Sequence, residues 1–112
     1  MRYTVTADDT AFALGSGDVN VLATPRLIAW LEAASVAEAA PQLRPGQTTV
    51  GAAVRVRHRR PTPVGGTVEV YARLTTDGDR LTFDVSAVDG DGHTVADGEI
   101  DRVVVDRADF TG

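Results

Sequence analysis

Three polar residues within the first 58 positions of the chain belong to types that carry acid–base or nucleophilic chemistry. Thr24 precedes a proline, Glu32 follows eight residues later in an apolar stretch, and His58 comes twenty-six residues after Glu32. An ionised carboxylate in apolar surroundings is costly unless it is paired, protonated or used in chemistry. A hydroxyl, a carboxylate and an imidazole together could hold a nucleophile, activate it and move its proton.

A helix is expected to present Glu32. Thr24 is predicted to cap the first free amides of this helix, and Pro25 suits its first position, where no N–H is needed. From there to Ala40 nearly every side chain is apolar. A helix that is apolar on almost all sides is typical of one wrapped by other structure. Prolines at 41 and 45 and a glycine at 46 predict its end.

Strands are predicted after the helix, because apolar residues then recur at every second position. Val54, Val56 and His58 share one side of the first of these strands, so we expect His58 to lie on the apolar side. Turn residues at Gly78 and at 89–92 predict antiparallel hairpins that join segments 68–74, 81–87 and 93–106.

The order of elements is one short strand, one long helix and four strands, which predicts an α+β fold in a single domain over residues 1–112. A single apolar helix is best buried by a curved antiparallel sheet that folds around it, the arrangement called a hotdog fold. Such a sheet keeps an exposed edge and leaves one flank of the helix uncovered. We therefore expect a homodimer and leave a tetramer open.

Composition excludes several classes of function. The chain has no cysteine and only two histidines, so we expect no disulfide, no thiol nucleophile and no metal site. A formal net charge of −5 argues against nucleic-acid binding. No run of residues reaches membrane-spanning length, and the N-terminus lacks the apolar core of a signal peptide. We expect a cytoplasmic protein without a membrane or nucleic-acid partner.

The spacing of Thr24, Glu32 and His58 resembles that of the fluoroacetyl-CoA thioesterase branch of the hotdog thioesterases. Members of that branch have a catalytic threonine that opens the helix, a glutamate eight residues later and a histidine twenty-six residues further on. Segments 29–32 and 61–63, together with Gly51 and Arg102, also match. The resemblance implies an acyl-CoA thioesterase that uses these three residues and needs no metal or redox cofactor.

Roles follow from the chemistry of thioester hydrolysis. Glu32 could take a proton from water or attack the carbonyl itself, and the sequence leaves both open. Thr24 could hold the water or the carbonyl, and His58 could act as an acid or keep Glu32 ionised. A backbone amide near Gly51 is a candidate oxyanion donor. Arg102 could act directly or form a charge pair beneath the site.

Each of these residues also has a structural explanation, namely a helix cap for Thr24, a paired carboxylate for Glu32 and a strand-end residue for His58. Arg57, Arg59 and Arg60 could bind the phosphates of coenzyme A, or they could be solvated surface charges.

One departure from the family pattern concerns the acyl group. The loop at residues 15–20 contains no phenylalanine, whereas the fluoroacetate-resistance enzyme covers its acyl group with phenylalanines in this loop. The resemblance therefore carries the reaction class and leaves the acyl group open. The main alternative is a noncatalytic hotdog protein that binds acyl-CoA or another small ligand. A hotdog hydratase is disfavoured, because the chain lacks the close aspartate–histidine pair of that branch.

Overall fold

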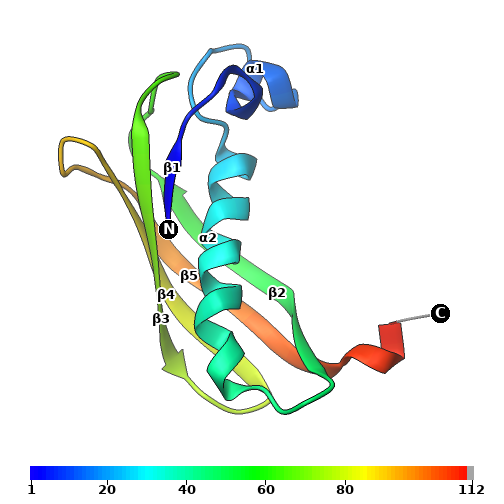
Figure 1. Cartoon of the computed structure of the whole chain (residues 1–112). Coiled ribbons are helices and arrows are strands. Elements are labelled where there is room, and N and C mark those ends of the chain that lie inside the picture. Colours follow the sequence, from blue (N-terminus) through cyan, green and yellow to red (C-terminus); the bar gives the residue numbers. More distant parts are fainter. Residues whose placement is uncertain (111–112) are drawn as a thin grey trace.

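One long helix, α2 (Thr24–Ala39), lies against a five-stranded sheet in the computed structural model, which describes residues 1–110 (Figure 1). All neighbouring strands are antiparallel, in the order β1-β3-β4-β5-β2. The strands are β1 (Arg2–Thr4), β2 (Gln47–His58), β3 (Thr67–Thr76), β4 (Arg80–Asp89) and β5 (Thr94–Asp106).

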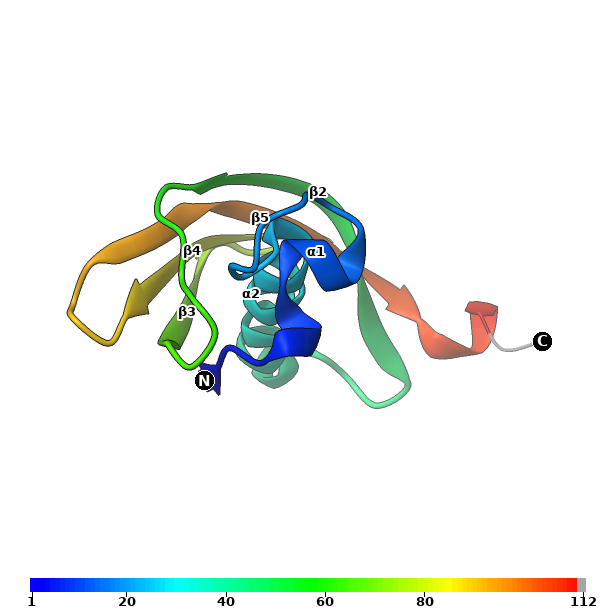
Figure 2. The same ribbon diagram turned by 90° about the horizontal axis from the view of Figure 1, so that it is seen from above.

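The sheet curves around α2, as the view from above shows (Figure 2). This arrangement confirms the predicted α+β architecture, a curved antiparallel sheet around one helix. The two predicted hairpins are present, since β3 pairs with β4 and β4 with β5. Strand β2 pairs with β5, so it forms one edge of the sheet.

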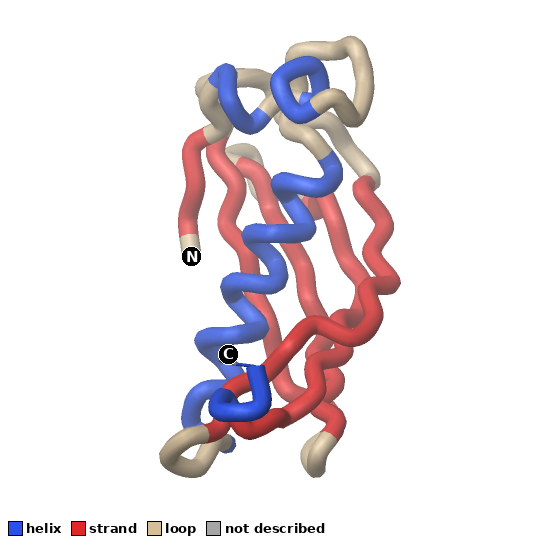
Figure 3. The backbone as a smooth tube through the Cα atoms, turned by 90° about the vertical axis from the view of Figure 1, so that its right-hand side faces the viewer, coloured by secondary structure: helices blue, strands red, loops and turns tan. Residues whose placement is uncertain are grey.

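The core lies between α2 and the concave face of the sheet (Figure 3). The period-two pattern places Val70 of β3 and Leu81 and Phe83 of β4 on this face, where they are at most 1% exposed. Leu27 and Leu31, one helical turn apart, face them and are fully buried. Burying each large side chain contributes about 1.5–3 kcal/mol to stability, so this face holds the helix on the sheet.

The prediction that α2 would be wrapped on most sides is wrong for the single chain. Only one side of the helix is buried, and Val36 on another side is 48% exposed. The sheet curves over one face of the helix and does not enclose it (Figure 2). An apolar flank beside Glu32 therefore remains uncovered.

Two irregularities shape β2. Its register with β5 shifts between Gly51 and Ala53, which marks a β-bulge, and bulges bend a strand and redirect its side chains. Farther along, Gly98 of β5 lies so close to β2 that a Cβ there would be 2.0 Å from the carbonyl oxygen of Arg55. These features set the path of the strand that carries Gly51 and His58.

Short helical segments complete the chain. They are η1 (Ala7–Asp9), α1 (Ala11–Leu14), η2 (Ala40–Gln42) and η3 (Arg107–Phe110). The η1 and α1 segments lie over the N-terminal end of α2 (Figures 1 and 3). An ion pair of 3.1 Å between Arg26 and Asp9 ties them to the helix. Within residues 1–110, no helix is long and apolar enough to cross a membrane.

Candidate active site

Thr24 and His58 are in direct contact, with 2.8 Å between the threonine Oγ1 and the imidazole Nδ1. The prediction that Thr24 caps the helix is wrong. Ala23 has the extended backbone of an N-cap residue, Thr24 is the first helical residue, and no side chain caps the helix. The threonine hydroxyl thus contacts the imidazole of His58 and does not bond to the free amides of the helix.

His58 stands at the end of β2 and is half-buried on the apolar side of the strand, as predicted. Burial lowers the pKa of its imidazole below the ordinary 6.5, and the backbone of Arg60 offsets this in part. The other ring nitrogen, Nε2, is buried and makes no hydrogen bond within the described residues. His58 is therefore neutral near pH 7 and able to exchange a proton with the Thr24 hydroxyl.

Glu32 projects from α2 toward Arg102 of β5, with 3.6 Å between Oε2 and Nη1. Arg102 is only 7% exposed, and Thr49 holds its guanidinium, accepting from Nε at 2.8 Å and, through its carbonyl, from Nη2 at 3.3 Å. Burial lowers the pKa of Arg102, while the charge of Glu32 opposes this. The Glu32 side chain is 38% exposed, so its carboxylate has a buried counter-charge and remains open to a substrate.

Gly51 is the residue of β2 that faces this carboxylate. A Cβ at position 51 would lie 2.8 Å from Oε2 of Glu32 and 3.6 Å from Nη1 of Arg102. The absence of a side chain therefore lets the strand approach the carboxylate closely. The adjacent bulge also allows this close approach to the Glu32 carboxylate, because it bends β2 between Gly51 and Ala53.

The structure thus places the predicted residues in two clusters. Thr24 and His58 form one, at the N-terminal end of α2, and Glu32, Gly51 and Arg102 form the other. Thr24 and Glu32 are eight residues apart, which is about 12 Å along a helix axis. Side chains on a helix lean toward its N-terminus, so the long side chain of Glu32 reaches toward Thr24 but does not span the distance between them.

A cleft of about 230 Å³ lies beside the Thr24–His58 pair. Its other lining residues come from the segment before α2 and from the residues that follow β2, namely Ala11, Ser16, Val21, Leu22, Arg59, Arg60 and Pro61. Sequence reasoning missed the contribution of Ala11, Ser16 and Val21, because they belong to a four-residue helix and to the loop after it, which are too short or too irregular to carry a periodic pattern. The glycine-rich composition around Ser16 was the only signal for a loop there.

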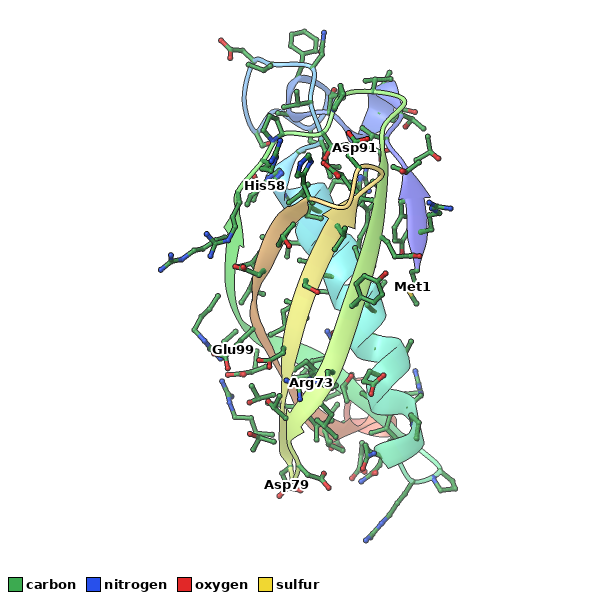
Figure 4. The ribbon with its side chains drawn as sticks, turned by 90° about the vertical axis from the view of Figure 1, so that its left-hand side faces the viewer. Met1, His58, Arg73, Asp79, Asp91 and Glu99 are labelled. Carbon is green, nitrogen blue, oxygen red and sulfur yellow. The ribbon has the colours of Figure 1, made fainter. Side chains whose placement is uncertain are left out.

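The three arginines that were candidates for phosphate binding differ in their surroundings. Arg57 is exposed and does not line the cleft. Arg59 lines it, but its Nε donates to Asp97 at 2.9 Å. Arg60 lines it as well and forms no ion pair within residues 1–110. Figure 4 shows His58 at the end of the molecule where the β4–β5 turn, marked by Asp91, also lies.

One group of potential metal ligands occurs in that turn. Ligand atoms of Asp89, Asp91 and His93 lie within 4.8 Å of one another. Asp89 accepts hydrogen bonds of 3.0 Å from the backbone N–H groups of Asp91 and His93. These hydrogen bonds explain why the three side chains lie close together, because aspartate side chains commonly stabilise turns by accepting from backbone N–H groups.

Comparison with known proteins gives a consistent result. The sequence pattern of the family described as fluoroacetyl-CoA-specific thioesterase matches residues 5–108. The fluoroacetyl-CoA thioesterase of Streptantibioticus cattleyicolor is 38% identical over 91 residues, which cover 80% of this chain and 65% of that protein. The match therefore spans just under two thirds of the length of this curated relative.

Solved structures agree with this relationship. A crystal structure of a point mutant of the fluoroacetyl-CoA-specific thioesterase, in complex with fluoroacetate and CoA, has a TM-score of 0.89 and 32% identity. The match covers 99% of this chain and 94% of that one. A hypothetical protein of Thermus thermophilus, a member of the thioesterase superfamily, also has a TM-score of 0.89, with 28% identity over 98% of this chain and 82% of that one.

Proposed function

Because the chain belongs to the fluoroacetyl-CoA-specific thioesterase family, we propose that it hydrolyses acyl-CoA thioesters to a carboxylic acid and free CoA. The hydrogen bond between Thr24 and His58 carries this proposal. It joins a hydroxyl to a neutral imidazole in the wall of a cleft, the pairing that handles protons in acyl transfer.

Glu32 supplies the base in this proposal. Its carboxylate takes a proton from water, the water oxygen bonds to the thioester carbon, and the C–S bond breaks. The proton then passes to the departing CoA thiolate, which balances the reaction. Arg102 supports the ionised carboxylate from beneath. A positioned base contributes about 10²–10⁴-fold in rate.

The remaining groups hold the substrate. Thr24 and His58 position the thioester, and backbone amides of Gly51 and of the first turn of α2 stabilise the oxyanion. These acid–base groups suffice for the chemistry, so we infer an enzyme without a metal or redox cofactor. We also infer a cytoplasmic location, because that is where acyl-CoA substrates are generally available.

A homodimer completes this site. Strand β2 leaves its outer edge unpaired over twelve residues, and such edges favour pairing with another chain. Val54 in this strand is 41% exposed, and Val36 on the flank of α2 is 48% exposed. A two-fold partner that covers them would bring Glu32 of one subunit toward the Thr24–His58 pair of the other, which removes the 12 Å separation.

The substitution Glu32→Gln tests the function. We expect acyl-CoA turnover to fall by at least 10²-fold while acyl-CoA binding is kept, because the amide preserves shape and cannot accept the proton. Thiol release from acetyl-, fluoroacetyl-, medium-chain and aromatic acyl-CoAs measures turnover, and calorimetry measures binding. Full turnover by the variant would refute the role of Glu32. Binding without turnover by the unaltered protein would favour a noncatalytic acyl-CoA-binding protein.

A further inference from the structure

The eleven arginines of the chain divide into two groups within residues 1–110. Six of them form ion pairs with carboxylates, namely Arg26, Arg55, Arg59, Arg73, Arg80 and Arg102. The other five have no such partner among the described residues, namely Arg2, Arg44, Arg57, Arg60 and Arg107. Of these five, Arg60 alone lines the cleft beside Thr24 and His58.

The backbone at Arg60 is firmly held. The N–H groups of Arg59 and Arg60 both donate to the carbonyl of Val95, at 2.7 Å and 3.3 Å. Pro61 follows and restricts the conformation of the residue before it. The side chain of Arg60 is exposed, so a free guanidinium projects from a fixed position at the mouth of the cleft.

Asp89 lies close enough to Arg60 for the positive charge to act on its carboxylate. The pKa of Asp89 is lowered mainly by the hydrogen bond from the backbone N–H of His93, and Arg60 contributes only a small part. The carboxylate of Asp89 already accepts from the backbone of Asp91 and His93. Asp89 therefore does not neutralise Arg60, whose charge remains available to a ligand.

Resting on the proposed function, we propose that Arg60 is the arginine that binds a phosphate of the CoA moiety. The substrate carries several negative charges and the protein has a net charge of −5, so attraction must come from a local cation. A guanidinium suits a phosphate because it can donate two parallel hydrogen bonds. Arg59 is engaged by Asp97, and Arg57 lies outside the cleft, so the three candidate arginines reduce to one.

The test compares Arg60→Gln with Arg57→Gln as a matched control, since both remove one exposed arginine near the end of β2. For acetyl-CoA, we expect Arg60→Gln to raise KM by about 10-fold or more with kcat unchanged. For acetyl-pantetheine, which lacks phosphates, kcat/KM should stay within about twofold. Arg57→Gln should leave both substrates unaffected, and Arg60→Lys should restore part of the affinity.

Binding of free CoA, measured by calorimetry, tests the same claim without turnover. Arg60→Gln should weaken CoA binding by about 10-fold or more and reduce its dependence on salt, while Arg57→Gln should do neither. Equal CoA affinity in the Arg60→Gln variant and the unaltered protein would overturn the proposal. Absence of hydrolysis with every thioester would refute the proposed function alone, because the binding comparison still decides the role of Arg60.

Discussion

At the scale of single residues, the fold changes the ionisation of His58. Burial lowers the pKa of the imidazole below 6.5, and the Thr24 hydroxyl occupies Nδ1 at 2.8 Å. The imidazole therefore stays neutral to lower pH than it would in an unfolded chain. A neutral ring can accept a proton across the range in which a free histidine would already be charged.

This property predicts the pH dependence of activity. We expect kcat/KM to decline on the acid side as His58 becomes protonated, with the midpoint of that decline below pH 6.5. Initial rates at constant ionic strength, measured from pH 4 to pH 9, give the midpoint of the acid limb. A midpoint at pH 7 or above would contradict a buried, neutral histidine. The variant Glu32→Asp is the control, because it retains His58 and should retain a limb below pH 6.5.

The same shift has a definite sign for stability. Between the folded pKa and 6.5, the unfolded chain binds a proton at His58 that the folded protein does not bind. The contribution of His58 is therefore fully present above pH 6.5 and is lost as the pH falls through that window. Replacement of His58 by glutamine should remove this part of the slope of unfolding free energy against pH.

At the scale of elements, the path of β2 decides where the site residues lie. The bulge next to Gly51 brings this strand against Glu32, and the close approach at Gly98 draws the later part of β2 toward β5. On the outer face, Asp101 is 6% exposed and accepts hydrogen bonds from Arg55 and Arg80. These bonds tie β2, β5 and β4 together behind the site.

Gly98→Ala tests this account of β2. The new Cβ would meet the carbonyl oxygen of Arg55 at 2.0 Å, and the backbone φ of +155° disfavours a side chain. We expect a loss of about 2–5 kcal/mol of unfolding free energy, the sum of backbone strain and overpacking. Gly92→Ala is the control, because it has positive φ with nothing within 4 Å, and should lose only about 1–2 kcal/mol. Equal losses in urea unfolding at one protein concentration would contradict the account.

At the scale of the whole molecule, the uncovered flank of α2 and the unpaired edge of β2 lie on the side that presents Glu32. A single chain therefore exposes apolar surface next to its candidate base. Exposed apolar surface of this kind is typical of a site that binds another molecule. The proposed two-fold partner would cover this surface and join the two clusters.

Mixing two inactive variants tests this assembly. If Glu32 of one subunit acts with Thr24 and His58 of the other, a heterodimer of His58→Ala and Glu32→Gln contains one intact site. We expect co-refolded mixtures to regain up to about a quarter of the unaltered activity, since half of the randomly paired dimers then carry one of two sites. Each variant alone stays inactive. No recovery, with heterodimers verified by mass spectrometry, would show that all three residues act within one chain.

The sequence by itself determined the α+β class, the hairpins and the side of β2 on which His58 lies, because these follow from residue periodicity and turn residues. The spacing of Thr24, Glu32 and His58 was also sufficient to indicate the family. Tertiary structure decided which groups touch. The contacts of Thr24 with His58 and of Arg102 with Thr49 join residues 34 and 53 positions apart, and no local pattern reports such a distance.

The prediction of a threonine cap was wrong because the Thr24 hydroxyl contacts His58, which is distant in sequence, and does not bond to the nearby backbone amides. Which arginine of the cleft remains without an ion pair was likewise decided by tertiary structure, because the acidic partner of Arg59, Asp97, comes from another strand. The role of Gly51 depends on both the sequence and the tertiary structure. Its lack of a side chain is visible in the sequence, but only the bulge and the packing of α2 place the Glu32 carboxylate against it.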